Sequence, residues 1–410
     1  MLYPYKTQFA VISLLFTTIP ATTKLDAEDT GSACFKVYAH PQRAEQALAE
    51  LRSILAAGGR LCILVSGTFF LDHPLRLTSG NAGSKIVSAP GNMATFIGRS
   101  GASRGLEIIG ADDVVVQSIK FSSFQREGVY AQNARRVTIR SVAVEDIRSN
   151  AWSQGAVHLT GVSTDALIEN STIDGADYAG IIIDTDATSD ISGTRILNNR
   201  VQHSCRRIHD CGAIYVNDRG RVSRNIVIAG NVVTDFGPLS SGGRGIYLDD
   251  WASHVAVRNN YISGPGHFAF QIHGGRDNRI THNIVDMAHI YTALLYQAAA
   301  GSTRAAMMGN VVADNIFTRH AAPGPVFKVT DYTGAGGVSL RRNRQCIVKQ
   351  CIPTCRAKRA HRGEREASCL APEGDYTASR NGGDPGDTFL TFDPGPDGLS
   401  QPPGDNTGGY

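Results

Sequence analysis

The sequence predicts an all-β protein, a right-handed parallel β-helix solenoid with an N-terminal capping helix. Three features of the 410 residues support this fold: glycines that open short strands at intervals, a second column of serine and asparagine, and a helical segment before the first repeat. Self-similarity with a period of roughly 20–50 residues is typical of solenoids, in which each turn buries its apolar face against the next.

The first column consists of glycine or alanine residues that each open a short strand. Successive openings lie 23–33 residues apart by subtraction of their positions. They are Gly105, Gly128, Gly155, Gly180, Gly212, Gly245, Ala269 and Ala293. Because side chains alternate along a strand, we expect the first and third residues after each opening to fill the core and the fourth to point outward. This count places His158 in the core and gives the outer face a polar middle with Asp184, Asp249 and His273.

The second column follows each of these strands at a similar interval. Its members are Ser118, Ser141, Asn170, Asn199, Asn231, Asn260, Asn283 and Asn315. Stacked turns explain such a column, because inward amides can bond along the stack and satisfy backbone groups at tight corners. A β-sandwich would need hairpin turns such as Asn-Gly between its strands, and these are scarce in the sequence.

The segment before the repeats predicts a cap. Residues 43–57 carry apolar side chains at helical spacing, and Gly58-Gly59 ends that pattern. A helix at the start of a solenoid would cover its open end. We therefore expect a signal peptide (1–27), a cap with the first turns (34–100), the β-helix (101–320), a basic Cys-rich segment (321–370) and a disordered tail (371–410).

The first residues predict export from the cytoplasm. Lys6 precedes an apolar run over 9–19, and small residues follow at Ala21 and Ala27. The run is too short for a membrane span, although a buried strand or an anchor is the alternative. The formal net charge of +3, without a basic stripe, argues against nucleic acid as a partner. We expect a secreted or periplasmic protein with no membrane span.

Eight cysteines fit such an oxidising compartment. Cys205 and Cys211 bracket a short loop, and we predict that they form a disulfide that holds His209-Asp210 over the outer face. Cys34 and Cys62 flank the N-terminal segment. The remaining cysteines, which would form either disulfides or a zinc site, are Cys346, Cys351, Cys355 and Cys369. The sequence does not reveal their pairing.

Titratable residues lie on consecutive turns of the predicted outer face, about 4.8 Å apart. The catalytic candidates are Asp218, Asp249, Asp250 and His273. Asp218 lies six residues after Gly212, so its place on this face requires a bulge. Like charges at this spacing raise at least one pKa, as a general acid near neutral pH requires. The alternative is that these residues are solvated polar groups at strand ends.

Residues that could bind a substrate surround these candidates. They are Asp184, Asp210, Arg244, Tyr247, Trp251, Gln271 and Arg276. Arginines could hold acidic sugars, aromatic rings could carry sugar faces, and Gly274-Gly275 would let a ligand approach His273 closely. Asp184 with Asp186 and Asp190 forms either a solvated turn or a calcium site. No other cofactor is expected.

The stretch from Leu61 to Arg319 resembles the pectate-lyase-like superfamily of secreted β-helix proteins. The segments 67–71, 74–77, 209–215 and 245–250 resemble bacterial β-helix glycosidases. Polygalacturonases, a more distant comparison, carry Asn-Thr-Asp, Asp-Asp, Gly-His-Gly and Arg-Ile-Lys in order. Asp249-Asp250 matches the second motif, His273-Gly274 part of the third and Asn217-Asp218 loosely the first, whereas Arg-Ile-Lys is absent. The resemblance implies hydrolysis by paired carboxylates, and the absent motif leaves galacturonate specificity open.

The leading hypothesis is a secreted glycoside hydrolase that acts on a polysaccharide along the solenoid. Asp249 and Asp250 would be acid and base, with Asp218 or Asp184 as partner and His273 in a positioning role. A polysaccharide lyase or C5-epimerase acting on a uronate polymer is the second hypothesis. A non-catalytic carbohydrate-binding β-helix is the third.

Overall fold

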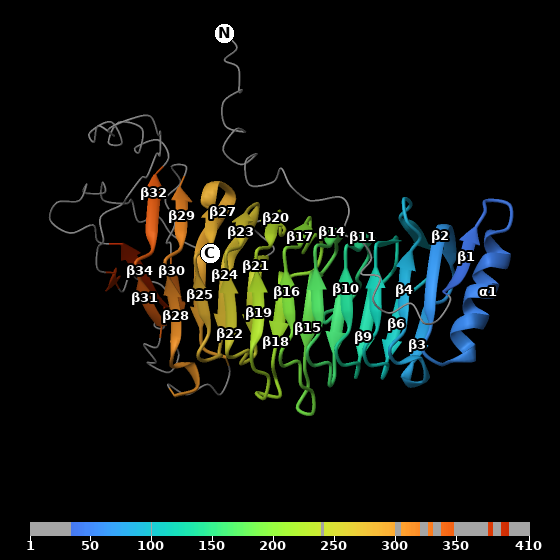
Figure 1. Cartoon of the computed structure of the whole chain (residues 1–410). Helices are drawn as coiled ribbons and strands as arrows, with labels where there is room; N and C mark the ends of the chain where they lie inside the picture. The colour runs from blue at the N-terminus through green and yellow to red at the C-terminus, as the bar shows by residue number, and fades with distance from the viewer. Residues whose placement is uncertain are drawn as a thin grey trace, which may run out of the picture.

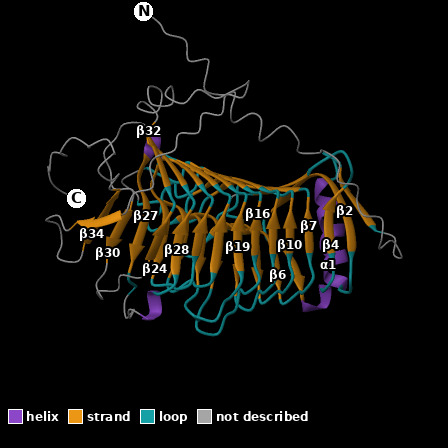
Figure 2. Cartoon of the chain, turned by 60° about the vertical axis from the view of Figure 1, so that its left-hand side comes forward, coloured by secondary structure: helices purple, strands orange, loops and turns teal. Residues whose placement is uncertain are grey.

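The computed structural model describes residues 34–99, 101–238, 242–299, 305–319, 327–330, 338–347, 376–379 and 387–392. The predicted signal peptide, Cys351, Cys355 and Cys369 lie outside these residues. Within them the chain winds as a long stack of parallel strands from one end of the molecule to the other (Figures 1 and 2). The fold is an all-β, right-handed parallel solenoid of about ten turns, as the sequence predicts.

Three parallel sheets, A, B and C, run along the stack, and β2 passes from sheet A into sheet B. Sheet C, which carries the candidate site, contains β3 (Leu75–Thr78), β6 (Arg104–Ile109), β9 (Glu127–Gln132), β12 (Gly155–Thr160), β15 (Ala179–Asp184), β18 (Gly212–Asn217), β21 (Arg244–Asp249), β24 (Gly266–His273), β27 (Ile290–Gln297) and β30 (Phe327–Thr330).

Sheet A contains β1 (Phe35–Ala39), the first half of β2 (Cys62–Leu71), β4 (Lys85–Ser88), β7 (Val115–Gln117), β10 (Thr138–Arg140), β13 (Leu167–Glu169), β16 (Arg195–Leu197), β19 (Ile226–Ala229), β22 (Val255–Arg258), β25 (Arg279–Thr281), β28 (Asn310–Ala313) and β31 (Val338–Arg341). Sheet B contains the second half of β2, β5 (Ala94–Gly98), β8 (Ile119–Ser122), β11 (Ala143–Ile147), β14 (Thr172–Ala176), β17 (Arg200–Gln202), β20 (Val232–Thr234), β23 (Tyr261–Ser263), β26 (Ile284–Asp286), β29 (Ile316–Arg319) and β32 (Arg344–Ile347).

The core is a set of side-chain columns that run along the stack. In sheet C one inward column contains Val129, Val157, Ile181, Ile214, Ile246, Phe270 and Leu294. Facing it, the rings of Phe69, Phe96 and Phe121 stack at centroid distances of 4.9 and 5.5 Å. Identical or similar residues at one register position let every turn bury its apolar side chains against the next.

The register corrects the sequence prediction at two turns. Gly155 pairs with Ala179 rather than Gly180, and Gly212 pairs with Arg244 rather than Gly245. Because the side-chain period of a strand is two, a shift of one residue exchanges the inner and outer faces. His158 and Tyr215 therefore point outward, whereas the count from the glycines predicted that they point into the core.

An asparagine ladder occupies the corner between sheets A and B. From Asn231 onward, each asparagine accepts, at its side-chain oxygen, the backbone N–H and the side-chain amide of the asparagine one turn earlier, over 2.9–3.1 Å. Its own amide also donates to a backbone carbonyl of the preceding turn. The ladder contains Asn199, Asn231, Asn260, Asn283, Asn315 and Asn343, all buried. The predicted inward column is confirmed from Asn199 onward.

Asn170 is a correction to that column. It is exposed and has a φ of 50°, and the next residue, Ser171, donates its backbone N–H to the Asn199 side chain instead. Asn170 thus occupies the left-handed position one residue before the ladder, where Ser118, Ser141, Asn198 and Gly230 also lie. Asparagine favours both a left-handed corner and a buried ladder, so the residue type alone does not distinguish the two positions.

The solenoid has a helix at its N-terminal end, at the predicted position, and extends beyond its predicted limit at the other end. Helix α1 (Ala44–Ala57) lies at one end of the stack (Figure 1), and it is the one α-helix in the described part of the chain. Its side chains Leu48, Leu51 and Leu55 join the same apolar core as the strands. At the other end, the parallel pairing continues through β30, β31 and β32, beyond the predicted limit at 320.

Two short strands lie in the segment that was predicted to be a disordered tail. β33 (Tyr376–Ser379) pairs with β34 (Asp387–Phe392), and β34 pairs antiparallel with β30 at the edge of sheet C. The rest of that segment lies outside the described residues. None of the helices within the described ranges is long and apolar enough to cross a membrane.

Replacing Asn231 by leucine is expected to destabilise the fold by about 1–3 kcal/mol, because the backbone N–H of Asn199 and the carbonyl of Ile196 would lose their partners in a buried corner. Chemical denaturation measures this free energy of unfolding. The matched control is Asn92→Leu at an exposed loop position. Equal stability of the two variants would contradict a structural role for the ladder.

Candidate functional site

One outward column of sheet C gathers the polar residues that the sequence singled out. We call it the outer row; it contains Thr160, Asp184, Asn217, Asp249, His273 and Gln297. These residues close strands β12 to β27, which lie side by side in the stack (Figure 1). Because parallel strands lie about 4.8 Å apart, the outer row is a continuous polar strip.

Asp249 is the most buried carboxylate of the outer row. Its Oδ1 lies 2.6 Å from His273 Nδ1, and its Oδ2 accepts a 2.5 Å hydrogen bond from the Tyr215 hydroxyl. Burial raises the pKa of the Asp249 carboxyl, but the bonds from His273 and Tyr215 outweigh burial and bring the net pKa below its ordinary value. Asp249 is therefore ionised at neutral pH.

Asp250 lies at the corner that follows β21 and differs from its neighbour. Its φ is 33°, and its Oδ2 accepts a 2.8 Å bond from Arg219 Nε and a longer one, 3.5 Å, from Asn217 Nδ2. Its Oδ1 lies 3.8 Å from His273 Nδ1. The side chain is partly exposed, so Asp250 presents a carboxylate to solvent beside the His273 ring.

His273 is held between these two carboxylates. Burial lowers the pKa of the imidazole, but the hydrogen bond to Asp249 and the charges of Asp249 and Asp250 raise it above its ordinary value overall. Because Nδ1 faces Asp249, Nε2 is left as the outward nitrogen, and no described residue bonds to it. The pair resembles the carboxylate–imidazole arrangement in which a buried acid fixes the tautomer of a proton-transfer histidine.

A second outward column supports the site from one side. Tyr215 and Tyr247 lie against each other with ring centroids 5.0 Å apart, and burial raises the pKa of both phenols, so they stay protonated. The Arg244 guanidinium lies 4.6 Å from the Tyr247 ring, bonds Gln271, and pairs with Asp210 at 3.1 Å. Tyr247 and Gln271 are 2% and 1% exposed, so neither offers a free face to a sugar in this arrangement.

The loop that carries Asp210 is closed by a disulfide between Cys205 and Cys211, as predicted. Asp210 bonds both Arg244 and the Tyr247 hydroxyl, so the loop does reach over the outer face of sheet C. A second disulfide joins Cys34 to Cys62 at the first turns.

Asp184 belongs to a separate network on the earlier turns of the same face. His158 Nε2 lies 2.9 Å from Asp184 Oδ1, and its Nδ1 lies 3.5 Å from Glu127, which in turn pairs with Arg104 at 2.6 Å. Burial lowers the pKa of His158, but the two carboxylates raise it to about 9. His158 is thus a buried cation that holds Asp184 ionised.

Asp218 is not on the outer face, so the predicted bulge is wrong. It is fully buried, and its carboxylate accepts bonds from Ser223 N and Ser223 Oγ at 3.1 and 3.0 Å. Asn217, its neighbour, takes the place in the outer row beside Asp249. Because β18 keeps its regular register up to Asn217, it contains no bulge, and Asp218 bonds within the turn that follows.

The last two predicted binding residues lie at the corner after the outer row. Trp251 is partly exposed and stacks with Arg221, whose guanidinium carbon is 3.9 Å from the ring. Arg276 is exposed and pairs with Asp277 at 2.7 Å rather than with the Asp249 group.

Three contacts of this site were missed by the sequence reasoning. They involve Tyr215, Arg219 and His158. The tyrosine and histidine were assigned to the core by the one-residue register error. Arg219 carries a recognisable signal, since it lies two residues beyond Asn217 and so shares its corner.

Asp249, Asp250 and His273 are also the described residues whose potential metal-ligand atoms lie within 4.8 Å of one another. Because His273 Nδ1 bonds Asp249, a metal ion would have to replace that bond. The predicted calcium residues Asp186 and Asp190 instead accept hydrogen bonds inside their own turns, from Thr188 and Ser189 and from Ser192, respectively. Asp184 bonds neither of them.

Comparison with known families agrees with the fold of the described residues. Residues 104–285 match the family model described as a right handed beta helix region. This region is a right-handed β-helix. No curated protein matches the chain.

Several solved structures share the β-helix at low identity. The catalytic domain of GH87 alpha-1,3-glucanase in complex with nigerose is 14% identical over 77% of this chain, with a TM-score of 0.49, and the chain spans 65% of that domain. An alginate lyase from Paenibacillus sp. str. FPU-7 is 17% identical over 76% of this chain and 94% of its own, with a TM-score of 0.46. PfbA, a surface adhesin of Streptococcus pneumoniae, is 12% identical over 88% and 99%, with a TM-score of 0.50.

Folding stability is expected to fall as pH rises through the pKa of His158. The folded pKa of about 9 exceeds the ordinary value of 6.5, so this contribution is full below pH 6.5 and is lost as pH rises through about 9. As pH rises from about 6 to about 10, the thermal midpoint of the wild type should therefore fall more than that of His158→Gln. His203→Gln, at an exposed histidine, is the control. Parallel curves for wild type and His158→Gln would contradict the assignment.

Proposed function

We propose that this chain is a secreted polysaccharide-active enzyme, a glycoside hydrolase that binds its substrate along the outer face of sheet C. The observation that supports this best is the cluster of Asp249, Asp250 and His273 within 4.8 Å on a partly exposed corner. Glycoside hydrolysis needs one group that protonates the leaving oxygen and one that activates water. The cluster offers both a cation that carries a proton, His273, and a partly exposed carboxylate, Asp250.

The directions of the pKa shifts support particular roles. Asp249 is held ionised, so it is unsuited to be the general acid and instead positions His273. The raised pKa of His273 makes its imidazolium the acid: Nε2–H gives its proton to the glycosidic oxygen as the C–O bond breaks. Water then attacks the anomeric carbon and passes a proton to Asp250, which Arg219 orients.

Elimination by a lyase, or C5-epimerisation, is the second candidate. Arg219 and Arg244 flank the cluster, and guanidinium groups can pair with a uronate carboxylate and stabilise the charge that follows proton abstraction. A calcium ion could serve the same purpose. The products discriminate the two reactions, because only elimination leaves an unsaturated sugar.

Two features of the first turns support the remaining expectations. We propose that α1 acts as a cap, because its apolar face closes the core at the end of the stack. The two disulfides support a secreted or periplasmic location, since such bonds persist in oxidising compartments.

Replacing Asp250 by asparagine is expected to reduce turnover by about 10²–10⁴-fold, because the amide keeps the shape but cannot accept a proton. The measurement is the release of reducing ends, with absorbance of unsaturated products followed in parallel, on uronate and neutral polysaccharides. Asp72→Asn, at an exposed ion pair far along the chain, is the matched control. Full activity in Asp250→Asn would remove this carboxylate from the mechanism. Unsaturated products would favour the lyase, and binding without turnover the non-catalytic alternative.

The pH profile of turnover is expected to report His273. If its imidazolium is the acid, the rate falls as pH rises through a pKa above the ordinary 6.5. Asp249→Asn should move this limb to lower pH, because the variant loses the carboxylate that raises the pKa. His273→Gln should lack the limb altogether. If Asp249→Asn leaves the alkaline limb at the same pH, the proposal that Asp249 raises the pKa of a catalytic His273 is contradicted.

A further inference from the structure

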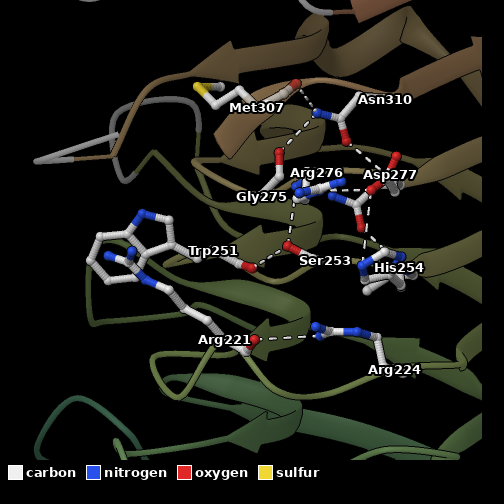
Figure 3. Close-up of polar contacts among 12 residues, drawn as sticks. Arg221, Arg224, Trp251, Ser253, His254, Gly275, Arg276, Asp277, Met307 and Asn310 are labelled. Atoms are coloured by element: carbon white, nitrogen blue, oxygen red, sulfur yellow. Dashed lines mark hydrogen bonds and ion pairs between the residues drawn. The ribbon is translucent and has the colours of Figure 1, made fainter. Parts of the chain in front are cut away.

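Arg221, in the turn after β18, stacks on Trp251 at the corner after β21, and no described carboxylate pairs with its charge. Figure 3 shows Arg221 extended toward the indole of Trp251, and its guanidinium carbon lies 3.9 Å from the ring centroid. Stacking engages the flat face of a guanidinium and leaves the N–H donors around its edge available. No carboxylate among the described residues pairs with Arg221, and its side chain donates no hydrogen bond to any of them.

This is unusual for the surroundings of the site. Arg219 pairs with Asp250, Arg244 with Asp210 and Arg276 with Asp277. Arg224, the remaining arginine of the same loop, donates to the backbone carbonyls of Arg221 and Ser223, and Figure 3 shows the first of these bonds. Arg221 is therefore the exposed cation at this corner whose donors remain available for an outside anion.

The backbone fixes the position of the Trp251 ring beside Asp250. Asp250 and Trp251 have φ values of 33° and 67°, in the left-handed region that residues other than glycine rarely adopt. Trp251 N donates to His273 O at 3.0 Å. Ser253 Oγ donates to Trp251 O at 2.6 Å, as Figure 3 shows, and both bonds hold the turn. Left-handed residues also occupy other corners of the solenoid, such as Asn170 and Asn198, so this turn uses the regular corner geometry to hold Trp251 next to Asp250.

We infer that Trp251 and Arg221 form a subsite for an acidic sugar unit, next to Asp250. The Arg221 edge would take the carboxylate or sulfate of the sugar as a bidentate partner, and Trp251 would fix the arginine and contact the sugar ring. The inference rests on the proposed function and names its substrate class: an anionic polysaccharide, with uronate or sulfated units. A neutral polymer has no anionic group that could pair with the Arg221 guanidinium.

Tryptophan fluorescence tests the subsite without turnover. The chain has two tryptophans, Trp152 and Trp251, so Trp152→Phe leaves Trp251 as the sole reporter. In a Trp152→Phe/His273→Gln background, oligomers from pectate, alginate and hyaluronate are titrated beside their carboxyl-reduced forms and a sulfated neutral oligomer. We expect a fluorescence change with an anionic oligomer, and about tenfold weaker binding after Arg221→Gln. Binding by the carboxylated but not the sulfated oligomers would assign the anion as a uronate.

Arg207→Gln, at an arginine that is 76% exposed on the disulfide loop, is the control and should bind as tightly as the parent. The inference is overturned if Arg221→Gln and Arg207→Gln bind every anionic oligomer equally, or if the carboxyl-reduced forms bind as well as the acidic ones. Turnover separates this outcome from failure of the proposed function. Hydrolysis of a neutral polymer at full rate by Arg221→Gln refutes the subsite alone, whereas Arg221-dependent binding without any turnover refutes the hydrolase alone.

Discussion

The register between successive turns is the constraint on which the rest of this structure depends. Hydrogen bonds between parallel strands would permit a slip of two residues, because such a slip keeps each face apolar or polar. The asparagine ladder opposes it, since each amide bonds both the backbone and the amide of its neighbour in a buried corner. A slipped turn would leave these groups unpaired at a cost of about 1–3 kcal/mol each. The ladder spans the turns that carry Asn217, Asp249 and His273, so the register of the site is held from the opposite side of the core.

This register brings histidine and aspartate side chains of neighbouring turns into contact on the outer face of sheet C, and these pairs determine its acid–base chemistry. Two histidine–aspartate pairs lie on one face, His158 with Asp184 and His273 with Asp249, and Asn217 separates them. In both pairs the carboxylate raises the pKa of the imidazole, yet their exposure differs. His158 is closed in by Glu127 on its other nitrogen, whereas His273 keeps Nε2 free toward the outer face. The first pair can hold charge only, and the second can exchange a proton with a ligand.

The sequence was sufficient for the fold because the repeat appears eight times, and an error at one turn does not change the period. The site depends on single positions, and there the errors matter. Counting from Gly155 and Gly212 displaced His158 and Tyr215 by one residue and assigned them to the core. Asn170 was assigned to the ladder because asparagine suits both the left-handed corner and the buried position. Asp249, Asp250 and His273 were brought together correctly, because Gly245 and Ala269 open their strands in the true register, and Asp249 and His273 each lie four residues further on. The contact of Arg219 depends on the direction of a side chain at a corner, which no periodicity specifies, whereas the contact of Tyr215 was missed through the register error.

The buried carboxylate of Asp249 shows how stability and chemistry are coupled at this corner. An ionised carboxylate in a desolvated position is unfavourable unless hydrogen bonds compensate it, and Tyr215 and His273 supply them. The bond between His273 and Asp249 stabilises the buried carboxylate and also orients the imidazole. His273 therefore both compensates the charge of Asp249 and is the residue proposed to transfer the proton. The strained turn at Asp250 and Trp251 then begins immediately after a position fixed by two strong bonds. The corner is thus held by the strand before it, by Arg219 at Asp250 and by Ser253 at Trp251, and this leaves the Asp250 carboxylate and the Arg221–Trp251 pair facing outward.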